Sequence, residues 1–321
     1  MHTCAVSKQI RVTVLAGGFG GARMAHGFAL LGDRVELSVI VNTADDLELH
    51  GLQISPDLDT VMYTLAGLAN EATGWGVLNE TWSASEMLER YARPTWFRLG
   101  DRDLATHIAR TEGLRSGQRL TEVTAGLAAS LAVRAALLPM TDDAVRTRLR
   151  TDDGWLDFQD YFVRRAHSDV VRELRFDGIA TAHATAEVLA AIDAADLIVV
   201  APSNPFVSVG PILALDGVRE RLEQADAPVI AVSPIICGAA VRGPAAALLG
   251  SLAGLQHTST GVATYYGRTY PGLLDVLVID EADADQASEI AAAGVRPIVS
   301  RTLIGDPADR RRLAAELLEL A

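Results

Sequence analysis

The sequence predicts an α/β fold, a doubly wound, Rossmann-like parallel sheet with a mostly helical insertion. Three observations indicate this: short apolar runs, helical patterns between them, and glycine-rich or polar loops directly after them. The runs are rich in Val and Ile, as expected of strands that helices cover on both faces. We expect strands at 11–17, 35–43, 195–203, 228–234 and 275–280.

Helical patterns at 184–195 and 211–224 separate the later strands, and further helices close the chain. The stretch from about 57 to 175 has mostly helical patterns. We expect it to be an insertion between the two halves of the sheet. Residues 1–321 are then a single catalytic unit, to whose ligand site this insertion contributes.

Charge and cysteine content exclude several classes of protein. The 321 residues carry a formal net charge of -13, so a broad basic surface for nucleic acid is not expected. Two cysteines form neither a disulfide framework nor a cysteine-rich zinc site. Neither a secretory signal nor an apolar run of about 18 residues is apparent. We therefore expect a cytoplasmic protein that binds neither nucleic acid nor a membrane.

The first expected strand leads into the turn Gly17-Gly18-Phe19-Gly20-Gly21-Ala22-Arg23. Glycines tolerate positive φ and let backbone amides approach an anion at the start of the following helix. The spacing does not fit a dinucleotide fingerprint, because Arg23 stands where the third glycine belongs, and the lysine of a P-loop is lacking. Phosphate binding is favoured over the alternative, a tight turn without a ligand.

An acidic loop follows the second expected strand. It contains Thr43, Asp45 and Asp46, and Asp57 and Asp59 come soon after. Carboxylate oxygens suit Mg²⁺ or a ribose. The alternative is a set of solvated loop acids with a helix N-cap among them.

Two later loops carry compact polar groups. Ser203 and Asn204 follow the third expected strand, and Ser233 to Gly238 follow the fourth, with Arg242 just beyond. Such groups can hold a base or a phosphate, although the same residues are common in ordinary turns. We expect Cys237 to be a small buried apolar residue and not a nucleophile.

The insertion contains a dense stretch from 96 to 107 that begins with Trp96 and Phe97. Its polar members are Arg98, Asp101, Asp103 and His107. Together these side chains could stack on and hydrogen-bond a planar ligand. The alternative is an acidic helix start with a solvated face.

Taken together, these segments resemble the 2-phospho-L-lactate transferase family of coenzyme F420 biosynthesis. The resemblance rests on LAGGFGGAR, NTADDLELHGLQISPDLDTVMY, FRLGDRDLATHIARTEGLRSGQRLTEVT, APSNPFVSVGPIL and SPIICGAAVRGPA, in the family's order over about residues 11 to 270. The chain is most similar to the bacterial branch, which is associated with a phosphoenolpyruvyl donor.

The resemblance implies a transfer reaction. The donor is a guanosine diphosphate ester of phosphoenolpyruvate or 2-phospho-L-lactate, and the acceptor is the ribityl hydroxyl of the deazaflavin FO. The products are dehydro-F420-0 or F420-0, together with GMP, and Mg²⁺ is required. The resemblance also implies a homodimer.

It further implies roles for the candidate residues. Asp45 and Asp57 would hold Mg²⁺, and Asp46 would contact the metal or the acceptor hydroxyl, which makes these three the catalytic candidates. The expected donor contacts are Gly17, Gly18, Phe19, Gly20, Gly21, Arg23, Ser203, Asn204, Ser233, Gly238 and Arg242, the last at a position where lysine is expected in many relatives. Thr43 is a further substrate-binding candidate. Arg98, Asp101, Asp103 and His107 would face the deazaflavin.

Two other functions compete with this interpretation. A nucleotide-sugar-binding regulatory protein of the same superfamily would share the glycine turn and the acidic loop but lack the GDRDLA segment, which is present at 100–105. A nicotinamide-dependent oxidoreductase is disfavoured by the incomplete dinucleotide fingerprint.

Overall fold

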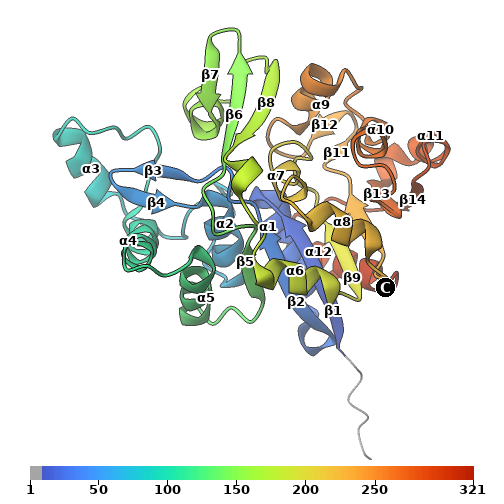
Figure 1. Cartoon of the computed structure of the whole chain (residues 1–321), viewed down its shortest axis with the longest axis horizontal. Coiled ribbons are helices and arrows are strands. Elements are labelled where there is room, and N and C mark those ends of the chain that lie inside the picture. Colours follow the sequence, from blue (N-terminus) through green and yellow to red (C-terminus); the bar gives the residue numbers. More distant parts are fainter. Residues whose placement is uncertain (1–8) are drawn as a thin grey trace, which may run out of the picture.

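The computed structural model describes residues 9–321, and a seven-stranded sheet forms their centre (Figure 1). Every neighbouring pair of strands in this sheet is parallel. In spatial order the strands are β14 (Arg296–Ser300), β13 (Val276–Asp280), β10 (Val229–Val232), β9 (Leu197–Val200), β1 (Ile10–Ala16), β2 (Val35–Val41) and β5 (Ala136–Pro139). The expected doubly wound α/β class is confirmed.

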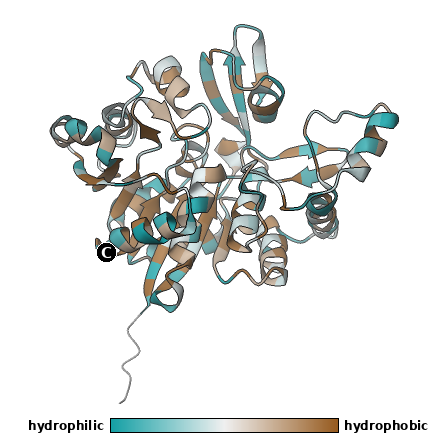
Figure 2. Cartoon of the chain, turned by 180° about the vertical axis from the view of Figure 1, so that it is seen from behind, coloured by the Kyte–Doolittle hydropathy of each residue, from teal (hydrophilic) through white to brown (hydrophobic). Residues whose placement is uncertain are grey.

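Residues of the central strands β1, β2, β5, β9, β10 and β13 enter two different cores, one on each face of the sheet. In β1, Val14 belongs to the core on one face, and Leu15 to the core on the other. The first face is covered by α1 (Gly18–Ala29), α2 (Pro56–Leu65), α5 (Leu120–Ser130) and α12 (Pro307–Leu318). The second is covered by α6 (Ala186–Asp193), α7 (Gly210–Leu213), α8 (Val218–Gln224), α9 (Ala245–Ala253), α10 (Ser259–Thr269) and α11 (Ala287–Ala292). Figure 2 shows the central strands coloured mainly as hydrophobic.

The strand order reverses beside β1. The chain runs from β1 outward to β2 and β5, then returns to β9 on the other side of β1. The register pairs Val12 with Leu197, so β1 and β9 end together at the same edge of the sheet. In open α/β sheets, the crevice at such a reversal is where ligands bind.

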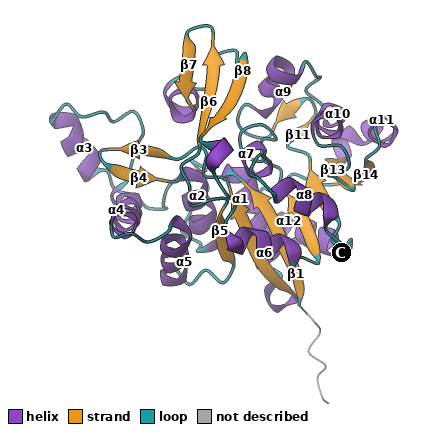
Figure 3. Cartoon of the chain, in the orientation of Figure 1, coloured by secondary structure: helices purple, strands orange, loops and turns teal. Residues whose placement is uncertain are grey.

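The segment 57–175 differs from the expectation of a mostly helical insertion. Its first half is helical and adds α3 (Ser83–Arg90) and α4 (Asp101–Arg115) to α2 and α5. Its second half supplies β5 to the central sheet and an antiparallel sheet in the order β7 (Gly154–Asp157), β6 (Arg146–Thr151), β8 (Glu173–Asp177) (Figure 3). In β6 the buried Thr147 and Leu149 alternate with arginines, a period of two that the high charge obscures in the sequence.

Small elements complete the fold. Two hairpins are formed by β3 (Leu47–Leu49) with β4 (Leu52–Ile54), and by β11 (Ile235–Ile236) with β12 (Ala239–Ala240). A π-helical turn spans Asp160–Arg164, and 3-10 turns span Gly32–Arg34, Ile179–Thr181 and Glu281–Gln286. Among the helices of residues 9–321, none combines the length and the apolar character needed to span a bilayer.

Candidate active site

The glycine turn is packed tightly between β1 and the loop that follows β9. A Cβ atom on Gly17 would lie 2.5 Å from the Cβ atom of Ser208, and one on Gly20 would overlap the carbonyl oxygen of Pro202. Ser203 Oγ donates a hydrogen bond to the Gly17 carbonyl oxygen over 2.9 Å. Side chains larger than glycine would therefore push the two loops apart.

The start of α1 is open to an anion. Gly17 precedes the helix, no side chain caps it, and its first turn contains no acidic residue. Gly18 has a φ of +58°, a conformation that favours glycine. The Gly17 amide donates to Ser203 Oγ over 3.4 Å and the Gly18 amide to Asp57, so the next amides of the helix, those of Phe19 and Gly20, are left for a ligand.

Two carboxylates from different elements meet beside this turn. Asn42, at the end of β2, donates through Nδ2 to Asp45 Oδ2 and to Asp57 Oδ2, both over 3.0 Å. Burial, and then the neighbouring Asp57 charge, raise the pKa of Asp45 well above its usual range. Burial raises the pKa of Asp57 to about 6.

This carboxylate pair has the chemistry of a divalent-cation site. Asp45 Oδ1 is buried and has no hydrogen-bond partner among the described residues. The buried Asp45 and the half-buried Asp57 carboxylates share one side-chain amide donor and are short of positive charge. A hard cation with oxygen ligands would supply that charge, so the residues present fit Mg²⁺.

The neighbouring acidic loop residues are placed differently. Asp46 accepts a hydrogen bond from Ser55 Oγ over 2.6 Å, and burial raises the pKa of its carboxyl to about 7. Thr43 is buried at 2% exposure. Thr43 and Asp46 are not among the residues that line the cavity, so a direct contact with a ligand there is not indicated for either.

A cavity with a volume of about 480 Å³ lies over the carboxyl ends of the strands. Its size is within the range of small-molecule sites. It brings together candidates that are far apart in the sequence. The predicted residues that line it are Gly17, Gly18, Phe19, Gly20, Arg23, Asp45, Asp57, Arg98, Asp103, His107, Ser203, Asn204, Ser233 and Arg242.

The loop after β9 offers the cavity an unused donor. Asn204 Oδ1 accepts a hydrogen bond from the Phe206 amide over 2.9 Å, which fixes the orientation of the side chain. Asn204 Nδ2 is buried without a partner among the described residues. Ser233, after β10, instead shares a 2.9 Å hydrogen bond with Ser259 and holds its loop in place.

Other predicted residues serve the framework and do not line the cavity. Asp101 accepts hydrogen bonds from Thr81 Oγ1 and from the first amides of α3, so its carboxylate fixes that helix. Gly21 packs against Ala16, where a Cβ atom would lie 2.7 Å from the Ala16 Cβ atom. Gly238, with a φ of +78°, lies in the turn between β11 and β12. The preceding Cys237 is exposed there, contrary to the expectation of burial.

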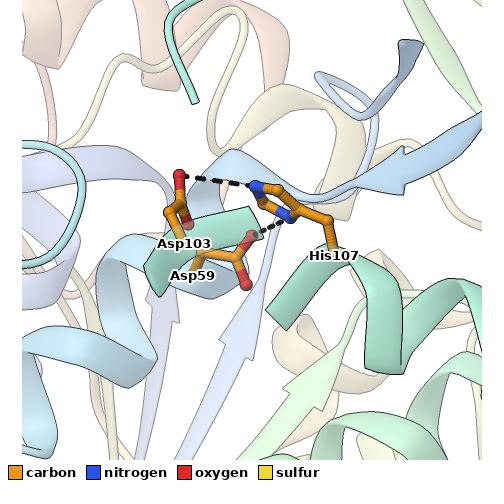
Figure 4. A group of neighbouring side chains, drawn as sticks. All are labelled: Asp59, Asp103 and His107. Carbon is orange, nitrogen blue, oxygen red and sulfur yellow. Dashed lines mark ion pairs between the residues drawn. The ribbon is translucent and has the colours of Figure 1, made fainter. Parts of the chain in front are cut away.

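A second cluster of titratable side chains consists of Asp59, Asp103 and His107 (Figure 4). All three residues line the cavity. His107 Nδ1 lies 3.6 Å from Asp59 Oδ2, and His107 Nε2 lies 3.3 Å from Asp103 Oδ2. Both carboxylates and the imidazole are at least nine-tenths buried. Three such groups could bind a metal ion.

The partners of this cluster argue against a metal ion. The buried Arg110 guanidinium bonds to both oxygens of Asp59, one of them over 3.1 Å. Its Nη1 also lies 3.3 Å from His107 Nδ1, and because arginine can only donate, that nitrogen is the acceptor. Tyr63 donates to Asp103 over 2.8 Å. The Arg110 guanidinium therefore supplies the positive charge of this cluster.

Comparison with known proteins identifies the family. The family model described as 2-phospho-L-lactate transferase CofD matches residues 12–300. The chain belongs to the CofD family. This confirms the resemblance seen in the motifs and the assignment as a transferase.

Relatives of this CofD family member match nearly their whole length. A protein from Streptomyces griseus subsp. griseus is 43% identical over 317 residues, covering 97% of this chain and 98% of the relative. One from Mycobacterium ulcerans is 43% identical over 331 residues, covering 97% and 99%. Both are named phosphoenolpyruvate transferase.

A solved structure supports the fold alone. A member of the UPF0052 family from Bacillus halodurans superposes with a TM-score of 0.66 at 17% identity, covering 97% of this chain and 99% of that one. The similarity therefore supports the α/β fold over the matched 97% of this chain.

The CofD family member also has cavity-lining residues that the sequence did not single out. Phe158 and Phe162 stack with ring centroids 5.4 Å apart and an interplanar angle of 10°. Phe158 directly follows β7 and Phe162 lies in the π-helical turn, both in the second half of an insertion that was expected to be mostly helical throughout. Trp75 also lines the cavity. The spacing of four residues between the two Phe side chains was the one signal for them.

Proposed function

We propose that this chain transfers a phosphoenolpyruvyl or 2-phospho-L-lactyl group from its guanosine diphosphate ester to the deazaflavin FO. Dehydro-F420-0 or F420-0 and GMP are the products. The observation that supports this best is the pair of carboxylates, Asp45 and Asp57, which Asn42 bridges. The pair lies beside a helix start without a side-chain cap, at the reversal of the strand order. Relatives of similar length that are named phosphoenolpyruvate transferase favour the enolpyruvyl donor.

In the proposed reaction, an oxygen of the FO side chain bonds to the phosphorus that carries the acid group. The bond from that phosphorus to GMP breaks, and the hydroxyl proton is released. Such a displacement depends on positioning and charge neutralisation. The amides at the start of α1 and Asn204 Nδ2 would bind the diphosphate and nucleotide, and no covalent intermediate is needed.

Asp45 and Asp57 would hold Mg²⁺. Bound there, the ion would neutralise phosphate charge and favour ionisation of the attacking hydroxyl. Phe158, Phe162 and Trp75 form apolar walls that suit the flat ring system of FO. A cytoplasmic location and a homodimer stay predictions.

The direct test is to incubate the chain with FO, MgCl₂ and each guanosine donor, and to identify the product by mass. We expect one deazaflavin product and one equivalent of GMP. FO fluorescence provides an independent measure of binding. Binding of UDP-sugars without any response to FO would instead support the regulatory function.

The proposed metal site predicts a pH-dependent response to Mg²⁺. The folded chain keeps protons on Asp57 up to about pH 6 and on Asp46 up to about pH 7, whereas the unfolded chain loses them near the ordinary value of 3.8. Without metal, the contribution of these carboxyls to the free energy of unfolding therefore falls as the pH rises from about 4 to about 7. Mg²⁺ replaces protons, so MgCl₂ should raise Tm more at pH 8 than at pH 5.

Thermal unfolding with and without MgCl₂ at both pH values measures this response. The Asp45→Asn/Asp57→Asn double variant is expected to lose the Mg²⁺-dependent rise. An equal rise at the two pH values, or its survival in the double variant, would place the metal elsewhere.

A further inference from the structure

Two arginines from distant parts of the chain lie over one aromatic ring in the cavity wall. The Cζ atom of Arg23, on α1, is 3.9 Å from the centroid of the Phe19 ring. The Cζ atom of Arg242, in the loop between β12 and α9, is 4.7 Å from the same centroid. All three residues line the cavity, so two guanidinium groups face the same ligand space.

The positive charges of these two guanidinium groups are not fully balanced by neighbouring carboxylates. Arg23 and the buried Arg310 share one carboxylate, Glu71, over 3.2 and 2.6 Å. Arg242 makes no ion pair within residues 9–321, and its guanidinium donates instead to the Thr73 carbonyl oxygen. Burial, followed by the charges of Arg310 and Arg242, lowers the pKa of Arg23. Two cations therefore share one carboxylate and Arg242 has none, and a bound anion would restore the balance.

The position of Arg242 is fixed before any ligand binds. Its guanidinium packs against Gly74, where a Cβ atom would overlap it, and the φ of +73° at Gly74 favours glycine. The ring of Phe19 supports the guanidinium as in other cation–π contacts. The arginine is thus held at the cavity while its charge stays unpaired.

The diphosphate of the proposed donor already has a place elsewhere. The Gly18 amide donates to the metal candidate Asp57, and a Cβ atom on Gly17 would be 2.9 Å from Asp57 Oδ2. The open amides of Phe19 and Gly20 therefore begin next to this carboxylate. A diphosphate bridging the amides and a metal at Asp57 would use both features. The donor then has one anionic group left, the carboxylate of its three-carbon acid.

We propose that Arg23 and Arg242, supported by Phe19, bind this carboxylate and so select a donor that carries it. The proposal rests on the function proposed above. A planar guanidinium matches a carboxylate through paired N–H groups, which gives orientation as well as affinity. Both possible acids carry the carboxylate, so the site recognises either.

Titration calorimetry on the full chain with two ligands tests the proposal. The first ligand is the guanosine diphosphate ester of 2-phospho-L-lactate, and the second is GDP, which lacks the carboxylate. In Arg242→Met, the affinity for the ester should fall about 10- to 100-fold, and that for GDP should change by less than about 2-fold. Arg242→Lys keeps the positive charge but lacks the paired N–H groups of the planar guanidinium, so we expect an intermediate loss of affinity for the ester.

A matched control is Arg175→Met. Arg175 also lies over an aromatic ring, with its Cζ atom 4.1 Å from the centroid of Trp155, but it does not line the cavity. Neither ligand should lose affinity in this variant. In turnover assays, Arg242→Met should raise the KM for the donor more than it lowers kcat, because the carboxylate does not react.

Three outcomes would overturn the proposal. Equal losses for the ester and GDP would make the arginines a phosphate site. Unchanged affinity for both ligands would show that Arg242 does not contact the donor. If the unaltered chain binds neither guanosine ligand, the proposed function fails, and this proposal fails with it.

Discussion

Asp45→Asn is expected to lower turnover at least ~10³-fold and leave the fold intact. The variant removes the buried one of two carboxylates that share the Asn42 amide, and with it a proposed ligand of Mg²⁺. Loss of metal-based charge stabilisation is worth several kcal/mol of barrier, which corresponds to about this factor. The rate of GMP release, quantified by chromatography, measures this loss of turnover.

The same substitution should not weaken the fold at pH 8. The pKa of Asp45 is raised by burial and by Asp57, so its ionised form is unfavourable in the folded chain. An asparagine oxygen still accepts from Asn42, and urea unfolding should show no loss of stability. Glu48→Gln, an exposed change in β3, is the control with normal turnover. Near-normal turnover of Asp45→Asn would refute the metal assignment.

Arg110→Met is expected to have the largest effect on stability. Arg110 is 1% exposed and bonds to both oxygens of the buried Asp59. Removing one partner of a buried ion pair leaves an uncompensated charge, which costs about 3–5 kcal/mol. The midpoint of urea unfolding should fall accordingly.

Arg115→Met is the matched control for this prediction. Arg115 ends the same helix, where it donates to the carbonyl oxygen of Gly51 on the surface, and its loss should cost at most about 0.5 kcal/mol. The Asp59→Leu/Arg110→Met double variant should recover much of the lost stability, because no lone charge remains. If Arg110→Met behaved like the control, the ion pair would not stabilise the fold.

The sequence was most informative where strands are buried on both faces. All five expected strands are present, because continuous Val and Ile runs have few other stable settings in an α/β fold. The sequence analysis did not predict two strands of the central sheet, β5 and β14, which are short or contain proline. The antiparallel strands β6 to β8 were missed because their exposed faces carry arginines and acids instead of apolar residues.

For the site, the sequence predicted which loops meet but not which side chains point inward. The topology brings every loop after a central strand to one edge, so Asp45 and Asn204 converge there, and Asp57 joins them from the first turn of α2. Asp101 and Asp103 are two residues apart on α4, yet only Asp103 lines the cavity. That difference depends on Thr81 and α3, which bond to Asp101 from another part of the chain.

The placement of β1 at the middle of the sheet also affects how the chain is made. Its neighbour β9 is paired across a sequence separation of about 185 residues, as between Arg11 and Asp196. At about 5–20 residues per second, a ribosome needs on the order of 10–40 s to synthesise that interval. During this interval, the backbone N–H and C=O groups on the β9 side of β1 have no partner strand, and unpaired strand edges of this kind promote aggregation. Non-local pairing of this kind also makes folding slow. The crevice beside β1 therefore forms only after β9 has been synthesised, late in the production of the chain.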